Sequence, residues 1–454
     1  MAAAMASERF DAIVVGMGPG GEVAATRLLD AGKRVAAVEQ ELIGGECGYW
    51  ACIPSKTVLR PGEVVSEATR AAGVDGAATS WTEARGYRDY MARHLDDSAQ
   101  VQGYADQGAV VVKGSGRVTG PGRVEVDGRE LTADNVIIAT GSVAFVPPVD
   151  GLDAATVWTN RETFTTADLP GRATIVGGSA VGVETAMFLA RFGAAPTIVQ
   201  RSDRLLRREE RRVSELTAEH LGAAGVDVRT GVRPVRARAE GADSVLELDD
   251  GTSVDGDVIV FATGRMPRTA GLGLEHAGVR LDDRGAVVVD DQCRAAEGVW
   301  AIGDVTSIMA FTHVAKYQGR VVADNILGRE RTAHYEGIPR VVFADPEIAA
   351  VGLTEEEAEA RDLHTRSAEV DLPAVIARPW TYEREPRGHL GLVADVERGV
   401  LVGAWAVAPQ ASEWIHQAAI AIRARIPIDV LSDQVAQFPT YTEGFLRALD
   451  ALAT

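Results

Sequence analysis

The sequence has few cysteines: Cys47, Cys52 and Cys293 are the only three among 454 residues. Because one further thiol remains beside the pair, and no CxxC or histidine spacing completes a set of four ligands, we expect no zinc site. The four residues between Cys47 and Cys52 let two thiols close a small ring that is easily oxidised and reduced. Paired cysteines in an intracellular protein are more often catalytic or metal-binding than structural. On spacing alone, a redox-active pair and two unpaired core thiols both remain open.

Long apolar runs and an excess of basic residues are missing as well. No run of about 18 apolar residues predicts a membrane span, and neither end has the basic, apolar character of a secretion signal. We therefore expect a cytoplasmic protein with no membrane partner, whose short Ala/Met leader is disordered. The formal net charge of −19 disfavours nucleic acid, because phosphates require a basic surface.

The length exceeds what one hydrophobic core normally organises, and it predicts two or three domains. With 46% hydrophobic residues and 48 glycines, the composition is typical of a globular enzyme rich in tight turns.

A glycine-rich loop follows the first apolar run. Residues 10–15 predict a buried parallel strand, and the next six residues fit GxGxxG. Gly16 permits the tight turn, Gly18 lets the backbone approach a pyrophosphate, and Gly21 allows close helix packing. A second strand at residues 34–38 ends in Glu39, the expected acidic partner for an adenosine ribose. The pattern predicts a dinucleotide at a helix amino terminus.

The same pattern returns in the middle of the chain. Residues 173–176 lead into Gly177, Ser179 and Gly182, and then into a predicted helix at 183–190. The second strand, 196–199, ends in Gln200 and Arg201 rather than in an acid. Without a carboxylate for the ribose, and with four arginines nearby, a 2′-phosphate and hence NADP(H) are favoured over NAD(H). The alternative is that Arg201, Arg204, Arg207 and Arg208 form a solvated helix face.

Several motifs together resemble the flavoprotein pyridine nucleotide-disulphide oxidoreductases, the family of glutathione reductase, dihydrolipoamide dehydrogenase and mercuric reductase. The motifs occur in the family's order: CxxxxC-Ile-Pro-Ser-Lys at 47–56, Ala-Thr-Gly-Ser at 139–142, the second glycine loop, Ala-Thr-Gly-Arg at 262–265, Trp-Ala-Ile-Gly-Asp at 300–304, and residues 346–355.

The resemblance implies an α/β protein with two Rossmann-like dinucleotide-binding domains and a carboxy-terminal α+β dimerisation domain. The expected limits are 1–145 and 270–333 for the FAD domain, 146–269 for the NAD(P) domain and 334–454 for the interface domain of a homodimer.

The resemblance also implies the site residues. Cys52 would be the low-pKa thiolate beside the flavin and Cys47 the interchange thiol. Lys56 would lie near the flavin and pair with Glu184, which prevents an isolated buried charge. Expected FAD contacts are Gly16, Gly18, Gly20, Gly21, Glu39, Gly45, Lys56, Gly116, Thr140, Gly141, Asp304 and Thr312. Expected NAD(P)H contacts are Gly177, Ser179, Gly182, Glu184, Gln200, Arg201, Arg207 and Gly264. His313 is expected to be a helix-start residue, not a base.

The chain departs from the family near its carboxy terminus. Relatives carry His before Pro-Thr in the segment that reaches the partner's site, whereas this chain has Phe438; Glu443 keeps the position of the acid that orients that His. Phenylalanine cannot carry the proton of thiol-disulfide exchange. Either another group carries it, with Tyr441 and Glu443 as candidates, or the acceptor needs no such carrier.

A second departure lies inside the cysteine loop, where Tyr49 and Trp50 replace small residues. The two aromatic side chains either pack in a core or reshape the substrate pocket. Glutathione, lipoamide and trypanothione are therefore not assumed as substrates, and mercury is not expected, because no carboxy-terminal cysteine pair is present.

We therefore predict that hydride equivalents pass from NAD(P)H through FAD to a Cys47–Cys52 disulfide and on to an unidentified small-molecule acceptor, with no metal involved. The alternatives are a quinone, diaphorase or transhydrogenase-like reductase that does not use disulfide exchange, and a non-catalytic redox-sensing flavoprotein.

Overall fold

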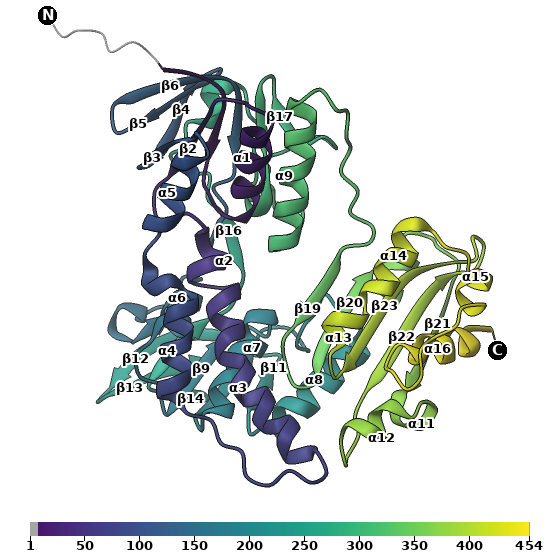
Figure 1. Ribbon diagram of the computed structural model, residues 1–454. Coiled ribbons are helices and arrows are strands. Elements are labelled where there is room, and N and C mark those ends of the chain that lie inside the picture. Colours follow the sequence, from purple (N-terminus) through teal and green to yellow (C-terminus); the bar gives the residue numbers. More distant parts are fainter. Residues whose placement is uncertain (1–7, 454) are drawn as a thin grey trace, which may run out of the picture. The chain divides into compact units, whose positions relative to one another are not determined.

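The computed structural model describes residues 8–453, so the Ala/Met leader predicted to be disordered lies outside the described residues. The chain divides into two compact units, which interleave along the sequence (Figure 1). The first unit contains the described residues up to Pro54, together with Tyr87–Phe145 and Gly264–His334. The second contains Ser55–Gly86, Val146–Thr263 and the chain from Tyr335 onward. Each unit is described by itself below.

The first unit is built on an eight-stranded sheet whose main path is β17-β18-β6-β1-β2-β3, with β4 and β5 at the side of β6. Its strands are β1 (Glu8–Val15), β2 (Val35–Glu39), β3 (Val110–Lys113), β4 (Gly116–Gly120), β5 (Arg123–Val126), β6 (Arg129–Ile138), β17 (Arg294–Ala296) and β18 (Val299–Ala301). The central strands are parallel and almost completely buried, which explains their apolar sequences. A separate antiparallel pair joins β7 (Ser142–Ala144) and β16 (Arg265–Pro267).

Helices α1 (Pro19–Asp30) and α9 (Thr312–Ile326) pack against each other in this unit (Figure 1). Glycine makes the approach possible, because a Cβ on Gly319 would lie 2.6 Å from the Gly20 carbonyl oxygen. Helices α2 (Gly45–Tyr49) and α5 (Ser98–Asp106) complete the unit. Helix α3 (Cys52–Arg70) begins in the first unit and continues into the second, whereas α4 (Trp81–Met91) runs from the second into the first.

The second unit contains a parallel sheet of order β11-β10-β9-β15-β8, an antiparallel sheet β12-β13-β14, and an antiparallel sheet β19-β20-β23-β22-β21. The parallel sheet comprises β8 (Val157–Trp158), β9 (Arg172–Val176), β10 (Ala195–Gln200), β11 (Asp227–Thr230) and β15 (Val258–Phe261). The antiparallel sheets comprise β12 (Pro234–Glu240), β13 (Asp243–Leu248), β14 (Ser253–Gly256), β19 (Pro339–Val342), β20 (Glu347–Gly352), β21 (Thr365–Asp371), β22 (His389–Asp395) and β23 (Val400–Ala408).

The helices of the second unit are α6 (Asn160–Thr165), α7 (Ala180–Arg191), α8 (Arg211–Ala223), α10 (Glu355–Glu359), α11 (Leu372–Val375), α12 (Arg378–Tyr382), α13 (Ala411–Trp414), α14 (His416–Ala424), α15 (Ile428–Ser432) and α16 (Glu443–Ala453). Only Ile415 separates α13 from α14. Because Ile415 itself keeps helical dihedral angles, φ −61° and ψ −21°, the two pieces are nearly continuous.

The two parallel sheets repeat one local design. In the first, Val15 lies opposite Val38, and in the second Val176 lies opposite Val199. Each pairing ends immediately before a glycine-rich loop that leads into a helix, α1 or α7. The predicted α/β class, with two Rossmann-like units and a carboxy-terminal α+β sheet, is confirmed. Among residues 8–453, no helix is long and apolar enough to cross a bilayer.

Candidate functional site

The first glycine loop is shaped for close backbone contacts. Gly16 has φ +99°, and a Cβ there would lie 2.4 Å from the Ala139 carbonyl oxygen. A Cβ on Gly21 would lie 2.1 Å from the Gly16 carbonyl oxygen, so α1 can begin directly against the strand. In contrast, a Cβ on Gly18 would meet nothing within 4 Å. Gly18 is also the N-cap of α1 and provides no side-chain cap, which leaves first-turn amides open to an anion.

Glu39 closes this loop from the end of β2. Its Oε2 accepts from the Met17 amide at 2.7 Å, and its Oε1 accepts from the Glu41 amide at 2.8 Å. Burial raises the pKa of Glu39, and the two amide hydrogen bonds oppose that rise. A carboxylate held this way has lone pairs left for ribose hydroxyls.

The second glycine loop repeats these contacts with one substitution. A Cβ on Gly177 would lie 2.5 Å from the Ala262 carbonyl oxygen, and one on Gly182 would lie 2.0 Å from the Gly177 carbonyl oxygen. At the place of Glu39, Gln200 accepts from the Gly178 amide at 3.1 Å. An amide thus takes the structural role of the carboxylate without its charge. Ser179 caps α7 through Gly182 and donates to the Ala262 carbonyl oxygen at 2.8 Å.

The four arginines after Gln200 do not lie on a helix, because α8 begins only at Arg211. The interpretation as a helix face is therefore wrong, although Arg201, Arg207 and Arg208 are solvent-exposed, as that interpretation expected. Arg204 donates to the carbonyl oxygens of Arg207 and Glu209, both at 2.9 Å, and so holds the loop together. Arg201 and Arg207 are exposed and follow Gln200 in the loop after β10.

The cysteine pair lies in the first unit, on the short helix α2 and at the start of the long helix α3 that follows it. Cys47 is on α2, and Cys52 is the first residue of α3. The side chains form a hydrogen bond with each other, and the Thr312 hydroxyl contacts both: it lies 3.4 Å from Cys52 Sγ and also hydrogen bonds to Cys47. Thr312 opens α9 and His313 follows it, which is the helix start that the family resemblance implies.

The pKa of the Cys47 thiol is raised, chiefly by the hydrogen bond with Cys52 and then by burial. Coulombic repulsion from Cys52 adds to the rise, whereas Thr312 and the charge of Lys316 act in the opposite direction. Two sulfur atoms this close share one proton readily but lose two with difficulty.

Tyr49 is fully buried, and its hydroxyl donates to the Ile43 carbonyl oxygen at 3.1 Å. Of the two interpretations of the loop aromatics, core packing therefore holds for Tyr49. Trp50 is half-buried, with its ring centroid 5.6 Å from that of Tyr49. Sequence reasoning missed Arg93, whose guanidinium lies 5.5 Å from the Tyr49 ring centroid.

Lys56 and Glu184 meet in the second unit, as the resemblance implies. Lys56 Nζ lies 2.6 Å from Glu184 Oε2, and Glu184 Oε1 accepts from the Phe343 amide at 3.0 Å. The ammonium also lies 4.8 Å from the Phe343 ring centroid, within cation–π range.

Asp304 belongs to a small polar cluster in the first unit. Ser142 Oγ donates to Asp304 Oδ2 at 2.6 Å, and Arg265 Nε donates to Ser142 Oγ at 2.6 Å. The sequence motifs contain Ser142 and Arg265, but their spacing does not show that they meet Asp304. Thr140 donates to the Arg268 carbonyl oxygen at 2.8 Å, and Gly141 and Gly264 have positive φ, +72° and +130°. Gly116 is buried in β4 among Val15, Val38 and Val124.

In the carboxy-terminal segment, the apolar residue Phe438 occupies the position where the family resemblance implies a proton-carrying histidine. The Phe438 side chain is 74% exposed. Glu443 accepts from the Thr440 amide at 3.2 Å, a turn-closing role within its own segment. Tyr441 is buried, and within residues 8–453 its hydroxyl meets no hydrogen-bond partner. Burial raises the pKa of Tyr441, which disfavours its loss of a proton near neutral pH.

Comparison with known proteins agrees with this geometry. Residues 10–319 match the family model described as pyridine nucleotide-disulphide oxidoreductase, and residues 338–449 match the dimerisation domain of the same family. The chain belongs to the pyridine nucleotide-disulphide oxidoreductase family. Family membership makes it a flavoprotein oxidoreductase that uses FAD and a pyridine nucleotide, with residues 338–449 as its dimerisation domain.

Relatives in this family include a dihydrolipoyl dehydrogenase from Thermus scotoductus, 34% identical over 98% of this chain and 97% of that protein. A glutathione reductase from Burkholderia cepacia is 33% identical over 96% of this chain and 98% of that protein. Among solved structures, the Cu(II) complex of the HOCl-induced flavoprotein disulfide reductase RclA from Escherichia coli superposes with a TM-score of 0.87 at 27% identity, covering 98% and 99% of the two chains.

The cofactors of the family fit the residues present. The open space at Gly18, the uncapped start of α1 and the Glu39 carboxylate at the end of β2 are suited to the adenine dinucleotide of FAD. The second loop has the same backbone cradle for a pyridine nucleotide, with Gln200 where a carboxylate would otherwise stand.

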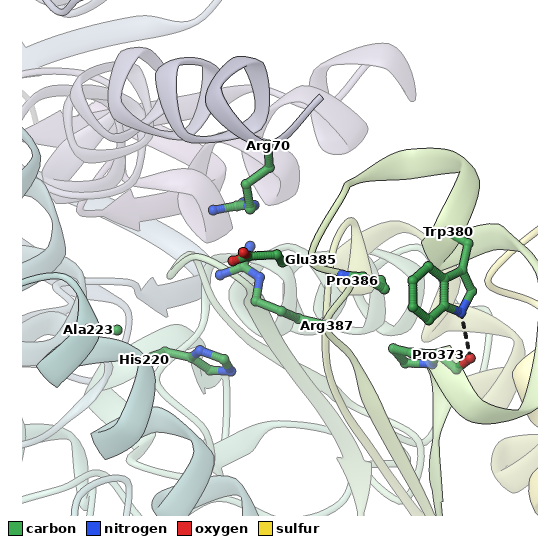
Figure 2. Close-up of a pocket in the computed structure, with 8 residues that line it drawn as sticks. All are labelled: Arg70, His220, Ala223, Pro373, Trp380, Glu385, Pro386 and Arg387. Carbon is green, nitrogen blue, oxygen red and sulfur yellow. Dashed lines mark hydrogen bonds between the residues drawn. The ribbon is translucent and has the colours of Figure 1, made fainter. Parts of the chain in front are cut away.

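A cavity of about 460 Å³ opens on the second unit of this family member and shares no lining residue with the predicted site (Figure 2). His220 and Arg387 lie in its wall, and Trp380 forms one side, anchored by a 2.8 Å hydrogen bond from its indole to the Pro373 carbonyl oxygen. Two lining residues, Arg70 and Arg387, also pair with Asp345, which receives three guanidinium groups: Arg70 at 3.0 Å, Arg387 at 2.8 Å and Arg191 at 2.6 Å. Glu383 also pairs with Arg70 and Arg387, so two carboxylates face three guanidinium groups in this cluster.

Proposed function

We propose that the protein transfers reducing equivalents from NADPH to a redox-active Cys47–Cys52 pair and then to a small-molecule acceptor that requires no imidazole at position 438. The observation that carries the proposal is the contact of both sulfur atoms with each other and with Thr312. FAD, when bound, supplies the two-electron relay between nicotinamide and thiol. The proposed domain limits are 1–145 and 270–333 for FAD, 146–269 for NADPH and 334–454 for a homodimer interface.

The two cysteines and the Lys56–Glu184 pair have different roles in the proposed reaction. Opening the disulfide leaves the charge on Cys52, and the proton stays on Cys47, whose pKa is raised by that neighbour. Cys47 then attacks the acceptor once it has lost its proton. Lys56 supplies positive charge one helical turn after Cys52 on α3, and Glu184 keeps that charge paired.

The preference for NADPH is part of the proposal. Gln200 has no negative charge to repel a 2′-phosphate, and exposed Arg201 and Arg207 follow it in the loop. Asp304, Thr140 and the other residues predicted to contact FAD remain proposed contacts.

One specific observation favours a second candidate, in which reduced flavin passes electrons directly to a quinone or similar acceptor. Phe438 cannot move a proton, and a missing acid-base group costs about 10²- to 10⁴-fold on the step that it serves. Disulfide exchange would suffer from that loss, whereas direct flavin oxidation would not.

Anaerobic titration with NADPH and with NADH tests the proposal. The reduced wild type should show a long-wavelength band from a thiolate beside the flavin, and Cys52→Ser should lack it. The proposal fails if neither nicotinamide reduces the flavin. A disulfide and quinone panel on the wild type and on Phe438→His then separates the two candidates: the quinone candidate expects wild-type disulfide turnover to be negligible and to rise in the variant.

A further inference from the structure

The cavity of the second unit has an aromatic side (Figure 2). Trp380 is 63% exposed, and the hydrogen bond from its indole to the Pro373 carbonyl oxygen fixes the ring in one position. Pro373, Pro386 and Ala223 add apolar surface to the lining. A fixed indole with much of its surface open provides a flat face on which an aromatic ring can stack. The cavity volume of about 460 Å³ lies in the range of small-molecule sites.

Two polar side chains of the wall have hydrogen-bond donors to spare. Arg387 donates from Nε to Glu383 and from Nη2 to Asp345, but within residues 8–453 its Nη1 makes no hydrogen bond. The His220 ring likewise has no hydrogen-bond partner among the described residues. Burial and the charge of Arg387 lower the pKa of His220 to about 4, so the ring is neutral near pH 7 and donates through one nitrogen.

The acceptors of the same wall are largely in use. The carbonyl oxygen of Arg70, the last residue of α3, accepts from the Arg384 amide at 2.9 Å. Near the end of α8, the His220 carbonyl oxygen accepts from the Ala224 amide at 3.1 Å. The acidic side chain of the lining, Glu385, is exposed. Since three guanidinium groups face two carboxylates behind this wall, the polar side of the cavity favours an anion over a cation.

We propose that this cavity binds a planar aromatic carboxylate, whose ring stacks on Trp380 while its carboxylate accepts from Arg387 and His220. The inference is independent of the proposed function, because the cavity shares no lining residue with the predicted redox site. The lining comes from α3, from α8 and from the segment 373–387, which together form a hollow of small-molecule size.

Isothermal titration calorimetry on the purified, flavin-containing protein tests the inference. The probe is 2-naphthoate, and two matched compounds separate its features: 2-naphthamide keeps the ring without the charge, and cyclohexanecarboxylate keeps the charge without an aromatic ring. Wild type should bind 2-naphthoate at least about tenfold more tightly than either compound, because each lacks one of the two contacts.

Paired variants test whether the probe binds in this cavity. Trp380→Leu should weaken binding of 2-naphthoate about three- to tenfold, whereas Trp380→Phe keeps a ring and should weaken it less than about threefold. His220→Leu removes a donor and should weaken binding about fivefold, whereas His220→Gln keeps a donor and should bind as wild type does. Glu385→Gln should strengthen binding about two- to fivefold, because a like charge is removed from the lining. Glu215→Gln, which removes an exposed charge of α8 outside the lining, is its control and should change nothing.

Three results would overturn the inference. The first is a wild type that binds 2-naphthoate no more tightly than the two matched compounds. The second is unchanged binding in both Trp380→Leu and His220→Leu, which would place the probe elsewhere on the protein. The third is an equal gain in Glu385→Gln and Glu215→Gln, which would show that the probe responds to net charge and not to this cavity.

Discussion

Lys56 Nζ lies 2.6 Å from Glu184 Oε2, and this ion pair joins α3 to α7 within the second unit. The Glu184 side chain is only 7% exposed, so its charge depends on Lys56 and on the Phe343 amide. Glu184→Gln should lower the free energy of unfolding by about 1–3 kcal/mol, because a partly buried ammonium loses its counter-charge. Urea denaturation measures the change. Glu215→Gln, which breaks an exposed pair with Arg212, is the control and should cost at most about 0.5 kcal/mol.

The carboxylate of Asp345 should contribute more to the free energy of unfolding than the Lys56–Glu184 ion pair does. Burial alone would raise its pKa, but the charges of Arg387 and Arg70 bring that pKa down to about 2. A lowered acid pKa stabilises the fold above the unfolded value near 3.8, and this contribution is lost as the pH falls through about 2. Asp345→Asn should therefore lower the free energy of unfolding by about 2–3 kcal/mol. The difference from wild type should be constant between pH 8 and pH 5; a difference that changes steeply in that range would contradict it.

His220 should make the stability of the protein sensitive to acid in a higher pH range than Asp345 does. Burial and the positive charge of Arg387 lower the pKa of His220 to about 4, from 6.5. The folded state binds this proton less tightly than the unfolded state, so the contribution of His220 is complete above pH 6.5 and is lost as the pH falls toward 4. When the pH is lowered from 7 to 4.5, the free energy of unfolding should fall in both proteins. The fall should be about 1–3 kcal/mol smaller for His220→Gln than for wild type. Parallel urea titrations at the two pH values measure this difference, and equal losses would show that His220 is not buried as a neutral ring.

The sequence predicted the repeated strand, glycine loop and helix units because their spacing is local. Residues 10–15 and 173–176 are continuous apolar runs, and the glycines follow within six residues. The backbone geometry then requires glycine at these positions, since a Cβ at Gly16 or Gly177 would collide with a carbonyl oxygen.

The cluster around Asp345 could not be predicted in this way. Its arginines, Arg70, Arg191 and Arg387, come from 275, 154 and 42 residues away, and no local pattern links them. The burial of Tyr441 was missed for a related reason: its neighbours Trp414 and Tyr382 belong to other helices. The contact of Thr312 with Cys52 spans 260 residues, and only the family resemblance brought the two segments together.

Gly16 and Gly18 should respond differently to the same substitution. Gly16→Ala should destabilise the first unit, because its Cβ would lie 2.4 Å from a backbone oxygen at φ +99°. Gly18→Ala should leave the stability of the flavin-free protein within about 0.5 kcal/mol, because its Cβ meets nothing within 4 Å and its φ is −72°. The new methyl group would occupy the space proposed for the pyrophosphate, so flavin content per protein should fall. Unchanged flavin content in Gly18→Ala, measured by absorbance after purification, would place the dinucleotide elsewhere.

Gln200 offers the sharpest test of nucleotide choice, because the Gly178 amide already holds its side chain at 3.1 Å. Gln200→Glu keeps the size and the accepting oxygen but adds a negative charge, which repels a 2′-phosphate and accepts from ribose hydroxyls. We expect kcat/KM for NADPH to fall about tenfold or more and that for NADH to rise, since one such charge contact is worth about 1–3 kcal/mol. Arg233→Gln, an exposed arginine of the same unit paired with Asp249, should change neither value. The prediction fails if wild type has a higher kcat/KM for NADH than for NADPH and Gln200→Glu changes neither value. In that case this loop does not discriminate between a 2′-phosphate and a 2′-hydroxyl, and the arginines that follow Gln200 do not contact the nucleotide.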